Sequence, residues 1–253
     1  AIRQDGQLAV LTFVPEEGVY AWCRFVDDGE YESVCCLPGS PEDHVFVVVK
    51  RTIDGNTVRY IEKLATEYWD TLPRAWRLRS ALATENPADN VISGLDHLEG
   101  EEVWAWADGR IQGPFEVTSG DITLADDDYD YVIVGLNYTG TWKSSKLSYG
   151  AQLGTALCQS KKFDHVGFMT HRCPPESFRF GSALDNTQAW PTPDPVAIDE
   201  ESLDDPLPEL SRDDLAASLS GSSTAPRLFI IMDTPAPVEI LGAVVHLVTE
   251  ERQ

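Results

Sequence analysis

Three residues that could bind a metal lie close together in the chain: His165, His171 and Cys173. Imidazole and thiolate are preferred zinc ligands, and a structural zinc site needs four such ligands at short, regular spacings. The spacing here matches no known zinc finger. Such a trio on a strand and its following loop more often packs in the core or lies at the surface. We therefore predict no metal at these residues.

A run of acidic residues could offer oxygen ligands to calcium. Its members are Asp126, Asp127, Asp128 and Asp130. The glycine and the terminal glutamate of an EF-type loop are missing, so a solvated acidic hairpin tip is the simpler interpretation.

Paired carboxylates could also hydrolyse glycosidic bonds, which requires two acids roughly 5–10 Å apart across a cleft. The chain has 42 acidic residues, so candidate pairs are plentiful and nothing singles one out. The candidates are Glu62, Asp96, Glu99 and Glu102. The tryptophans that could stack on sugar rings are Trp69, Trp76, Trp104, Trp106, Trp142 and Trp190. Core and interface positions explain these rings more simply.

The motifs of common enzyme classes are missing from this sequence. Neither GxxxxGK[ST] nor a strand-linked GxGxxG occurs, which argues against nucleotide hydrolysis. No GxSxG nucleophile elbow occurs either. We assign no catalytic residue and no cofactor, and we expect the protein not to be an enzyme.

The formal net charge is -23, from 42 acidic and 19 basic residues in a chain of 253. This balance excludes a basic surface that grips nucleic acid, because affinity for a polyanion comes from Lys and Arg displacing condensed counterions. Three explanations of the acidic excess stay open. It could serve solubility through self-repulsion, adaptation to a saline environment that screens charge, or a surface that stays close to DNA without holding it.

The cysteines and the hydropathy further limit the class of protein. The cysteines are Cys23, Cys35, Cys36, Cys158 and Cys173. An odd number with two adjacent favours reduced thiols that act as small buried hydrophobes. No run approaches the roughly 18 apolar residues of a membrane-spanning helix. The chain begins at Ala1 without a methionine, so we expect it to be a piece of a longer protein.

Short apolar runs separated by turn signals predict antiparallel strands at the start of the chain. The runs cover residues 7–14, 19–26, 31–37, 45–52 and 57–64. Asp28-Gly29 and Asp54-Gly55 are hairpin signals, because glycine accepts the positive φ of tight turns. The last four runs predict a four-stranded meander, the size of one propeller blade or half a sandwich.

A second series of strand signals predicts a small β-barrel or sandwich. Its runs cover residues 91–95, 102–107, 110–117, 122–124 and 131–136, with 161–170 and 177–180 closing the domain. Residues 144–157 are expected to form a linker or short helix. A weak capping box from Ser211 to Asp214 and the later Gly221 permit one short helix.

The predicted fold class is therefore all-β, comprising part of a β-propeller with an inserted small barrel or sandwich. Residues 1–80 are expected to form the blade-like meander and a connector, and residues 81–182 the inserted domain. Residues 183–226 are an acidic, proline-rich insertion, either functional or partly disordered. Residues 227–253 are expected to return as strands to the blade domain.

Four motifs follow one another in the N-terminal region. They are W-x-R at Trp22 and Arg24, G-x-x-E-S-V at Gly29 with Glu32, Ser33 and Val34, D-x-V-F-x-V-V-x-R at Asp43, Val45, Phe46 and Arg51, and R-Y-I-E at Arg59 to Glu62. In this order they resemble the blade of tail tubular protein B, the tail nozzle protein of short-tailed phages. That resemblance implies a propeller of which this segment is one part.

Three later segments extend the resemblance over most of the chain. Gly94-Leu-Asp-His-Leu-Glu-Gly100, with Val103 and the Ala107-Asp-Gly109 turn, is similar to the opening of the family's inserted domain. Val134-Gly-Leu-Asn-Tyr138 and Asp233-Thr-Pro-Ala-Pro-Val-Glu-Ile-Leu241 are similar to two of its strand segments. Residues 191–215 match no family motif. A complete member also carries many more residues before the blade, so either that part is missing or another chain completes the ring.

The resemblance implies a structural protein of the virion. Family members assemble as a homo-oligomeric ring, usually hexameric, at the distal end of the tail, where DNA leaves through the nozzle. It also implies contacts with other tail proteins, and DNA that passes without specific binding. Two alternatives stay open: a carbohydrate-binding or carbohydrate-active β-domain that contacts the host surface, and a propeller adaptor of cellular origin.

Overall fold

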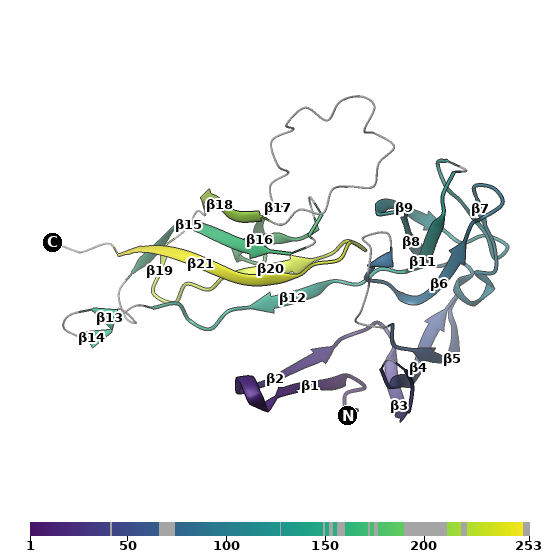
Figure 1. Ribbon diagram of the computed structural model, residues 1–253, viewed down its shortest axis with the longest axis horizontal. Coiled ribbons are helices and arrows are strands. Elements are labelled where there is room, and N and C mark those ends of the chain that lie inside the picture. The colour runs from purple at the N-terminus through teal and green to yellow at the C-terminus, as the bar shows by residue number, and fades with distance from the viewer. Residues whose placement is uncertain are drawn as a thin grey trace.

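The computed structural model describes residues 1–40, 42–65, 74–126, 128–148, 150–151, 154–155, 160–171, 173–174, 177–189, 212–218 and 222–249. Within these residues the chain is all-β, with two short 3-10 turns (Figure 1). Its strands form several small antiparallel sheets, and none of the described sheets closes into a barrel. No helix in this part of the chain is long and apolar enough to cross a membrane.

The N-terminal region divides into a hairpin and a three-stranded sheet. The hairpin consists of β1 (Leu8–Val14), η1 (Pro15–Glu17) and β2 (Val19–Phe25), and the sheet of β3 (Glu30–Leu37), β4 (His44–Ile53) and β5 (Asn56–Lys63). β2 and β3 do not pair, so the predicted four-stranded meander is wrong. Gly29 is needed for close packing instead of a hairpin turn, because a Cβ there would lie 2.8 Å from Val49 and 2.9 Å from the Lys50 carbonyl oxygen.

Two other Asx-Gly signals do form hairpin turns. Asp54 and Gly55 have φ of 46° and 71° between β4 and β5. Asp108 and Gly109 have φ of 45° and 86° between the next pair of strands. Positive φ at both central residues is the turn type whose twist matches that of the flanking strands. The turns predicted at Asp54-Gly55 and Asp108-Gly109 are confirmed.

The middle region builds a four-stranded sheet in the order β6-β11-β8-β9. Its strands are β6 (Arg79–Glu85), β11 (Tyr131–Leu136), β8 (Glu102–Ala107) and β9 (Arg110–Glu116). The pair β7 (Val91–Ile92) and β10 (Ile122–Thr123) and the turn η3 (Asp96–Leu98) accompany it. Ile53 of β4 belongs to the same apolar core as Leu98 and Val134, so this core extends to the N-terminal sheet.

Two further sheets carry the C-terminal half. One has the order β12 (Gly140–Lys143), β20 (Phe229–Met232), β16 (Arg179–Ala183) and β17 (Asn186–Ala189). The other centres on β15 (Lys161–Thr170), which pairs with β18 (Arg212–Ser218), β19 (Ser222–Ser223) and β21 (Ile240–Thr249). A small separate pair is β13 (Gly150–Ala151) and β14 (Gly154–Thr155). Buried Phe163, Phe168 and Phe180 come from both larger sheets and pack in one core, so these sheets lie face to face.

Several expectations about the second half are corrected. The strands after residue 227 do not return to the N-terminal sheet, because β20 pairs with β12 and β16, and β21 pairs with β15. Residues 212–218 form a strand in place of the predicted short helix, since pairing with β15 overrides the weak local capping signal. In the stretch 144–157 the described residues include short strands in place of a helix. Most of the predicted acidic insertion lies outside the described residues.

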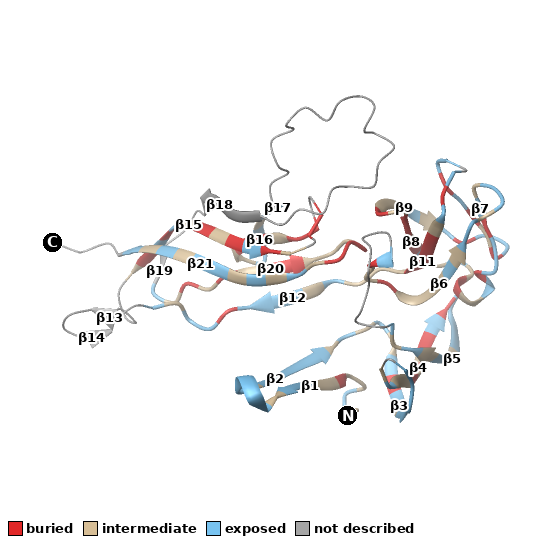
Figure 2. Cartoon of the chain, in the orientation of Figure 1, coloured by how far each residue is buried: buried red, intermediate tan, exposed pale blue. Residues whose placement is uncertain are grey.

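Burial differs between the sheets. Figure 2 shows buried residues in the middle and C-terminal sheets, whereas β2 is largely exposed and β1 is intermediate or exposed apart from buried Leu8. Only the base of this hairpin is fixed, where Leu8 joins Tyr31, Val47 and Val49 in a small core. The hairpin is therefore the least supported element among the described N-terminal strands.

Candidate functional site

The most unusual feature of the structure is a buried arginine. Arg51 is the only charged side chain on an apolar face of β4, where it alternates with Val47, Val49 and Ile53, and its side chain is 2% exposed. Burying a charge is costly unless it is paired and hydrogen-bonded. The partners of Arg51 therefore define a site that the fold must build.

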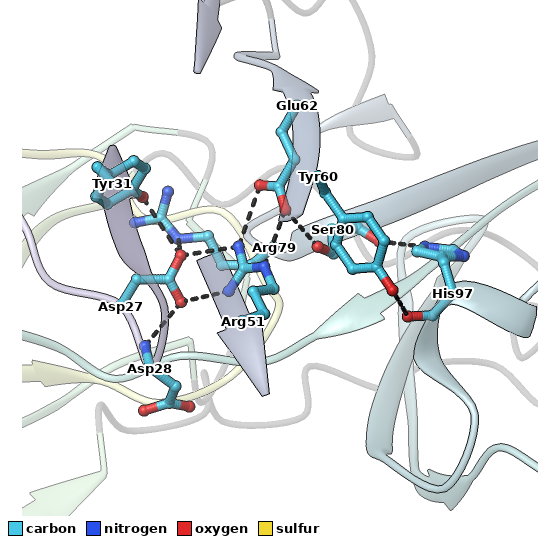
Figure 3. Close-up of polar contacts among 9 residues, drawn as sticks. All are labelled: Asp27, Asp28, Tyr31, Arg51, Tyr60, Glu62, Arg79, Ser80 and His97. Carbon is cyan, nitrogen blue, oxygen red and sulfur yellow. Dashed lines mark hydrogen bonds and ion pairs between the residues drawn. The ribbon is translucent and has the colours of Figure 1, made fainter. Parts of the chain in front are cut away.

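Two carboxylates clasp the guanidinium (Figure 3). Nη1 and Nη2 of Arg51 each donate to one oxygen of Asp27 at 2.9 Å. Nε and Nη2 donate to the two oxygens of Glu62 at 2.9 and 3.1 Å. Both contacts are bidentate, the strongest arrangement for an arginine and a carboxylate. Glu62 shares this face because β5 pairs with β4 in a register that places it opposite Val47.

A second ring of contacts ties the cluster to β6 and η3. The Ser80 hydroxyl donates to Glu62 at 2.5 Å, and the Arg79 Nε lies 3.8 Å from Asp27. The Tyr60 hydroxyl donates to the His97 carbonyl at 2.8 Å, and His97 Nε2 donates to the Ser80 carbonyl at 3.0 Å. The network thus spans the junction between the N-terminal sheet and the middle region.

The electrostatics keep this cluster ionised. Burial raises the pKa of Asp27, but hydrogen bonds and charge from Arg51, aided by Arg79, outweigh burial and leave the pKa below its usual value. Burial lowers the pKa of Arg51, but its bonds to Asp27 and Glu62 outweigh that effect and raise it. Burial, chiefly, raises the pKa of Tyr31 to about 12. Asp27 and Arg51 therefore stay charged and Tyr31 stays protonated near neutral pH, which suits these three groups to fixing geometry and not to transferring protons.

A second polar junction connects the middle region to the C-terminal strands. The guanidinium groups of Arg77 and Arg79 lie 4.6 and 4.3 Å from the centre of the Tyr138 ring. Arg77 also donates to the Thr234 carbonyl at 2.8 Å and to the Met232 carbonyl at 3.2 Å. Arg79 faces both junctions, because it also approaches Asp27.

Beside the first junction lies a polar pocket of about 500 Å³. Glu102 and Trp104, both predicted as candidates for carbohydrate chemistry, line this pocket together with Asp28, Glu101 and Asn137. The pocket therefore brings one predicted acid and one predicted ring together.

The other predicted carboxylates serve structural contacts. Glu62 belongs to the Arg51 cluster, and Glu99 accepts hydrogen bonds from the backbone of Ser119 and Gly120 at 2.8 and 2.7 Å. Asp96 starts η3 beside the same turn, close to Gly120. These side chains do not line the pocket.

The three residues that were considered as metal ligands have separate partners. His165 pairs with Asp164 at 3.0 Å and stacks on His246, whereas His171 pairs with Glu239 at 2.9 Å. The Cys173 thiol is buried, 3.0 Å from the Ser177 hydroxyl. In the part of the chain that the structure describes, no three His, Cys, Asp or Glu residues are grouped to hold a metal.

The acidic run and the tryptophans have varied surroundings. Asp126 accepts a hydrogen bond from Tyr129, the Asp130 amide donates to Asp108, and Asp127 lies outside the described residues. Trp106 is fully buried with Trp76 packed nearby, whereas Trp142 is 48% exposed. Trp69 and Trp190 lie outside the described residues.

Three residues of the junction have no distinguishing local pattern. Asp27, Arg79 and Ser80 lie outside the motifs described above, and nothing near them in the sequence marks them as partners of Arg51. The one available signal was Arg51 itself, a charged residue within a run of alternating apolar positions. Such a residue requires a buried counter-ion, although the sequence does not say which acid supplies it.

Comparisons with known proteins add no assignment. No protein-family model matches the chain, and no curated protein matches it. The resemblance to tail tubular protein B therefore depends on the motifs alone.

Proposed function

We propose that this chain is a non-enzymatic structural subunit of a phage tail nozzle of the tail tubular protein B type. In this proposal copies of the chain form a ring in the virion, contact other tail proteins and surround a passage for DNA. The three-stranded sheet β3–β5 would be part of a propeller that further strands complete.

One observation carries the proposal: residues from separate motifs meet at the two junctions. Arg51 and Glu62 come from two of the N-terminal motifs and bind each other, and His97 comes from the segment 94–100. Tyr138 comes from a third segment, and its ring contacts the guanidinium groups of Arg77 and Arg79. Motif residues that connect sheets, and that hold fixed charges, support a rigid building element better than a catalytic centre.

The charge supports a DNA passage. Duplex DNA carries about one negative charge per 1.7 Å, and six to ten contacts between phosphates and basic groups produce strong, salt-dependent binding. A wall rich in carboxylates avoids such retention. With a net charge of -23 the chain can supply such a wall.

Electron microscopy of the purified protein, alone and mixed with the neighbouring tail proteins, tests this function. We expect closed rings, with Asp and Glu enriched along the channel. A protein that stays monomeric under both conditions would contradict the nozzle assignment, and rings with a neutral or basic channel would contradict the role proposed for the charge.

The pocket beside the first junction favours a second candidate function, recognition of a carbohydrate. Trp104 could stack on a sugar ring, and Glu101, Glu102 and Asn137 could bind its hydroxyl groups. A glycan array compares the wild type with Trp104→Ala. Binding that the variant loses would favour this candidate, whereas no binding by the wild type would count against it.

A further inference from the structure

The hairpin of β1 and β2 exposes a continuous apolar face. Leu11 lies opposite Trp22, and Phe13 lies opposite Tyr20, so the four side chains share one side of the hairpin. They are 42%, 69%, 56% and 65% exposed, respectively. Large aromatic side chains carry roughly 150–250 Å² each, so this face presents on the order of 500 Å² of mostly apolar surface.

This hairpin has little support of its own. A two-stranded hairpin is marginal in water and needs a third strand or a packed face. β1 and β2 pair only with each other among the described strands. The start of β1 is covered on its outer side, where Ala1 and Ala9 exchange backbone hydrogen bonds, and beyond this point neither outer edge pairs with a described strand. The element has the composition and the open edges of an interface.

The C-terminal half has an open seam between its two larger sheets. β12 is the outer strand of one sheet and β21 pairs only with β15 in the other, as far as the described residues show. Between them lies an apolar cavity of about 350 Å³, lined by residues that include Trp142, Met232 and Ile240. The seam therefore has a free strand edge on each side and an apolar cavity between them.

The ends of the two elements carry opposite charges. The tip of the hairpin holds Glu16 and Glu17, both exposed. Lys143 ends β12 and Lys146 follows it, and both are exposed. The chain has 19 basic residues against 42 acidic ones, so two exposed lysines close together form a local excess of positive charge.

We propose that the β1–β2 hairpin of one copy docks into the seam between β12 and β21 of the next copy. The apolar face would cover the cavity around Trp142, and the acidic tip would meet Lys143 and Lys146. This inference rests on the proposed ring and names the two surfaces that form it. The contact joins two different surfaces of identical chains, which is the head-to-tail type that closes into a ring.

The available area fits a stable contact between copies. A standard interface buries roughly 800 Å² on each partner. The apolar face supplies over half of that, and the strand edges and charged tip supply polar surface around it. A second copy is the occupant best matched to the seam, because the chain itself provides an apolar hairpin, free edges and the complementary charge.

Two kinds of variant test the contact in sedimentation velocity and electron microscopy, with circular dichroism to verify folding. We expect Trp22→Glu to weaken self-association at least tenfold, in keeping with the loss of an aromatic anchor. Val91→Glu is the matched control, since Val91 is an exposed apolar residue on β7 that belongs neither to the two surfaces nor to the sheet β3–β5, and the change should leave association unchanged.

Charge-reversal variants test the proposed contact between the acidic tip and the two lysines specifically. Glu16→Lys with Glu17→Lys, and separately Lys143→Glu with Lys146→Glu, should each weaken association, and the four changes together should restore it. Rings that persist in Trp22→Glu, or an absent rescue, would overturn this inference and leave the nozzle proposal standing. A change in the sedimentation coefficient of Trp22→Glu without a change in molecular mass would also overturn this inference. Such a result would mean that the hairpin covers the seam of its own chain. A monomeric wild type would instead refute the ring itself.

Discussion

Removing the guanidinium of Arg51 should be among the most damaging single changes in the N-terminal half. Arg51→Met keeps much of the apolar stem and deletes four hydrogen bonds to Asp27 and Glu62. The Asp27 side chain is 4% exposed and the Glu62 side chain 19%, so at least one carboxylate is left buried without its main partner. Breaking a buried ion pair from one side costs about 3–5 kcal/mol.

Thermal and urea unfolding, followed by circular dichroism, measure this loss. For a chain of this size about 3–5 kcal/mol corresponds to a fall in Tm of roughly 6–20 °C. Arg59→Met is the matched control, because Arg59 makes a similar bidentate contact with Glu32 but is 58% exposed. Exposed pairs contribute about 0–1 kcal/mol.

Replacing all three charges separates charge burial from packing. The variant Asp27→Leu, Arg51→Met, Glu62→Leu removes all three charges of the Arg51 cluster and leaves Arg79 on the rings of Phe25 and Tyr138. Such apolar substitutes for buried ion clusters are often neutral or stabilising. We expect the triple variant to be more stable than Arg51→Met alone. An Arg51→Met protein within 1 kcal/mol of the wild type, or a triple variant less stable than the single one, would refute the reasoning.

Three further predictions concern pH, packing and thiol reactivity. The pKa of Asp27 is lowered in the folded state, so its ionised form stabilises the fold above about pH 4, and this stabilisation is lost as the pH falls through the folded pKa. Unfolding measured at a series of acidic pH values should therefore show a smaller loss of stability in Asp27→Asn than in the wild type, and an equal loss would contradict this. Gly135→Ala should destabilise by about 1–3 kcal/mol in urea unfolding, because the new Cβ would lie 2.7 Å from the Arg79 carbonyl oxygen. Exposed Cys35 should react with a thiol reagent in the native protein, whereas buried Cys173, whose pKa is raised by burial, should react only after unfolding, as mass spectrometry of labelled peptides can establish.

Local pattern predicted most strands well. The runs 102–107, 131–136 and 161–170 coincide with β8, β11 and β15, because their apolar spacing and flanking turns are strong local signals. The sequence pattern does not predict β6, because polar residues make up about half of this strand and pairing with β11 defines it.

Pairing between distant segments was harder to predict. The partner of a strand depends on long-range packing, so nothing near residues 229–249 indicates that β20 and β21 join β12, β15 and β16. The same limit applies to the site. Arg51 predicts that a counter-ion exists, whereas Asp27 becomes that counter-ion only because Gly29 lets the chain between β2 and β3 pack closely on β4.

The shape of the guanidinium has a consequence for assembly. A planar guanidinium bound by two carboxylates can rotate only slightly without losing hydrogen bonds, whereas an apolar contact allows two sheets to shift past each other. The angle between the segment at Asp27 and the strands β4 and β5 is therefore set by bond directions around one side chain, and the hydrogen bond from Ser80 to Glu62 connects that arrangement to β6. In the proposed ring any angular error would be repeated at every copy, so one well-oriented arginine per copy would help the last copy to meet the first.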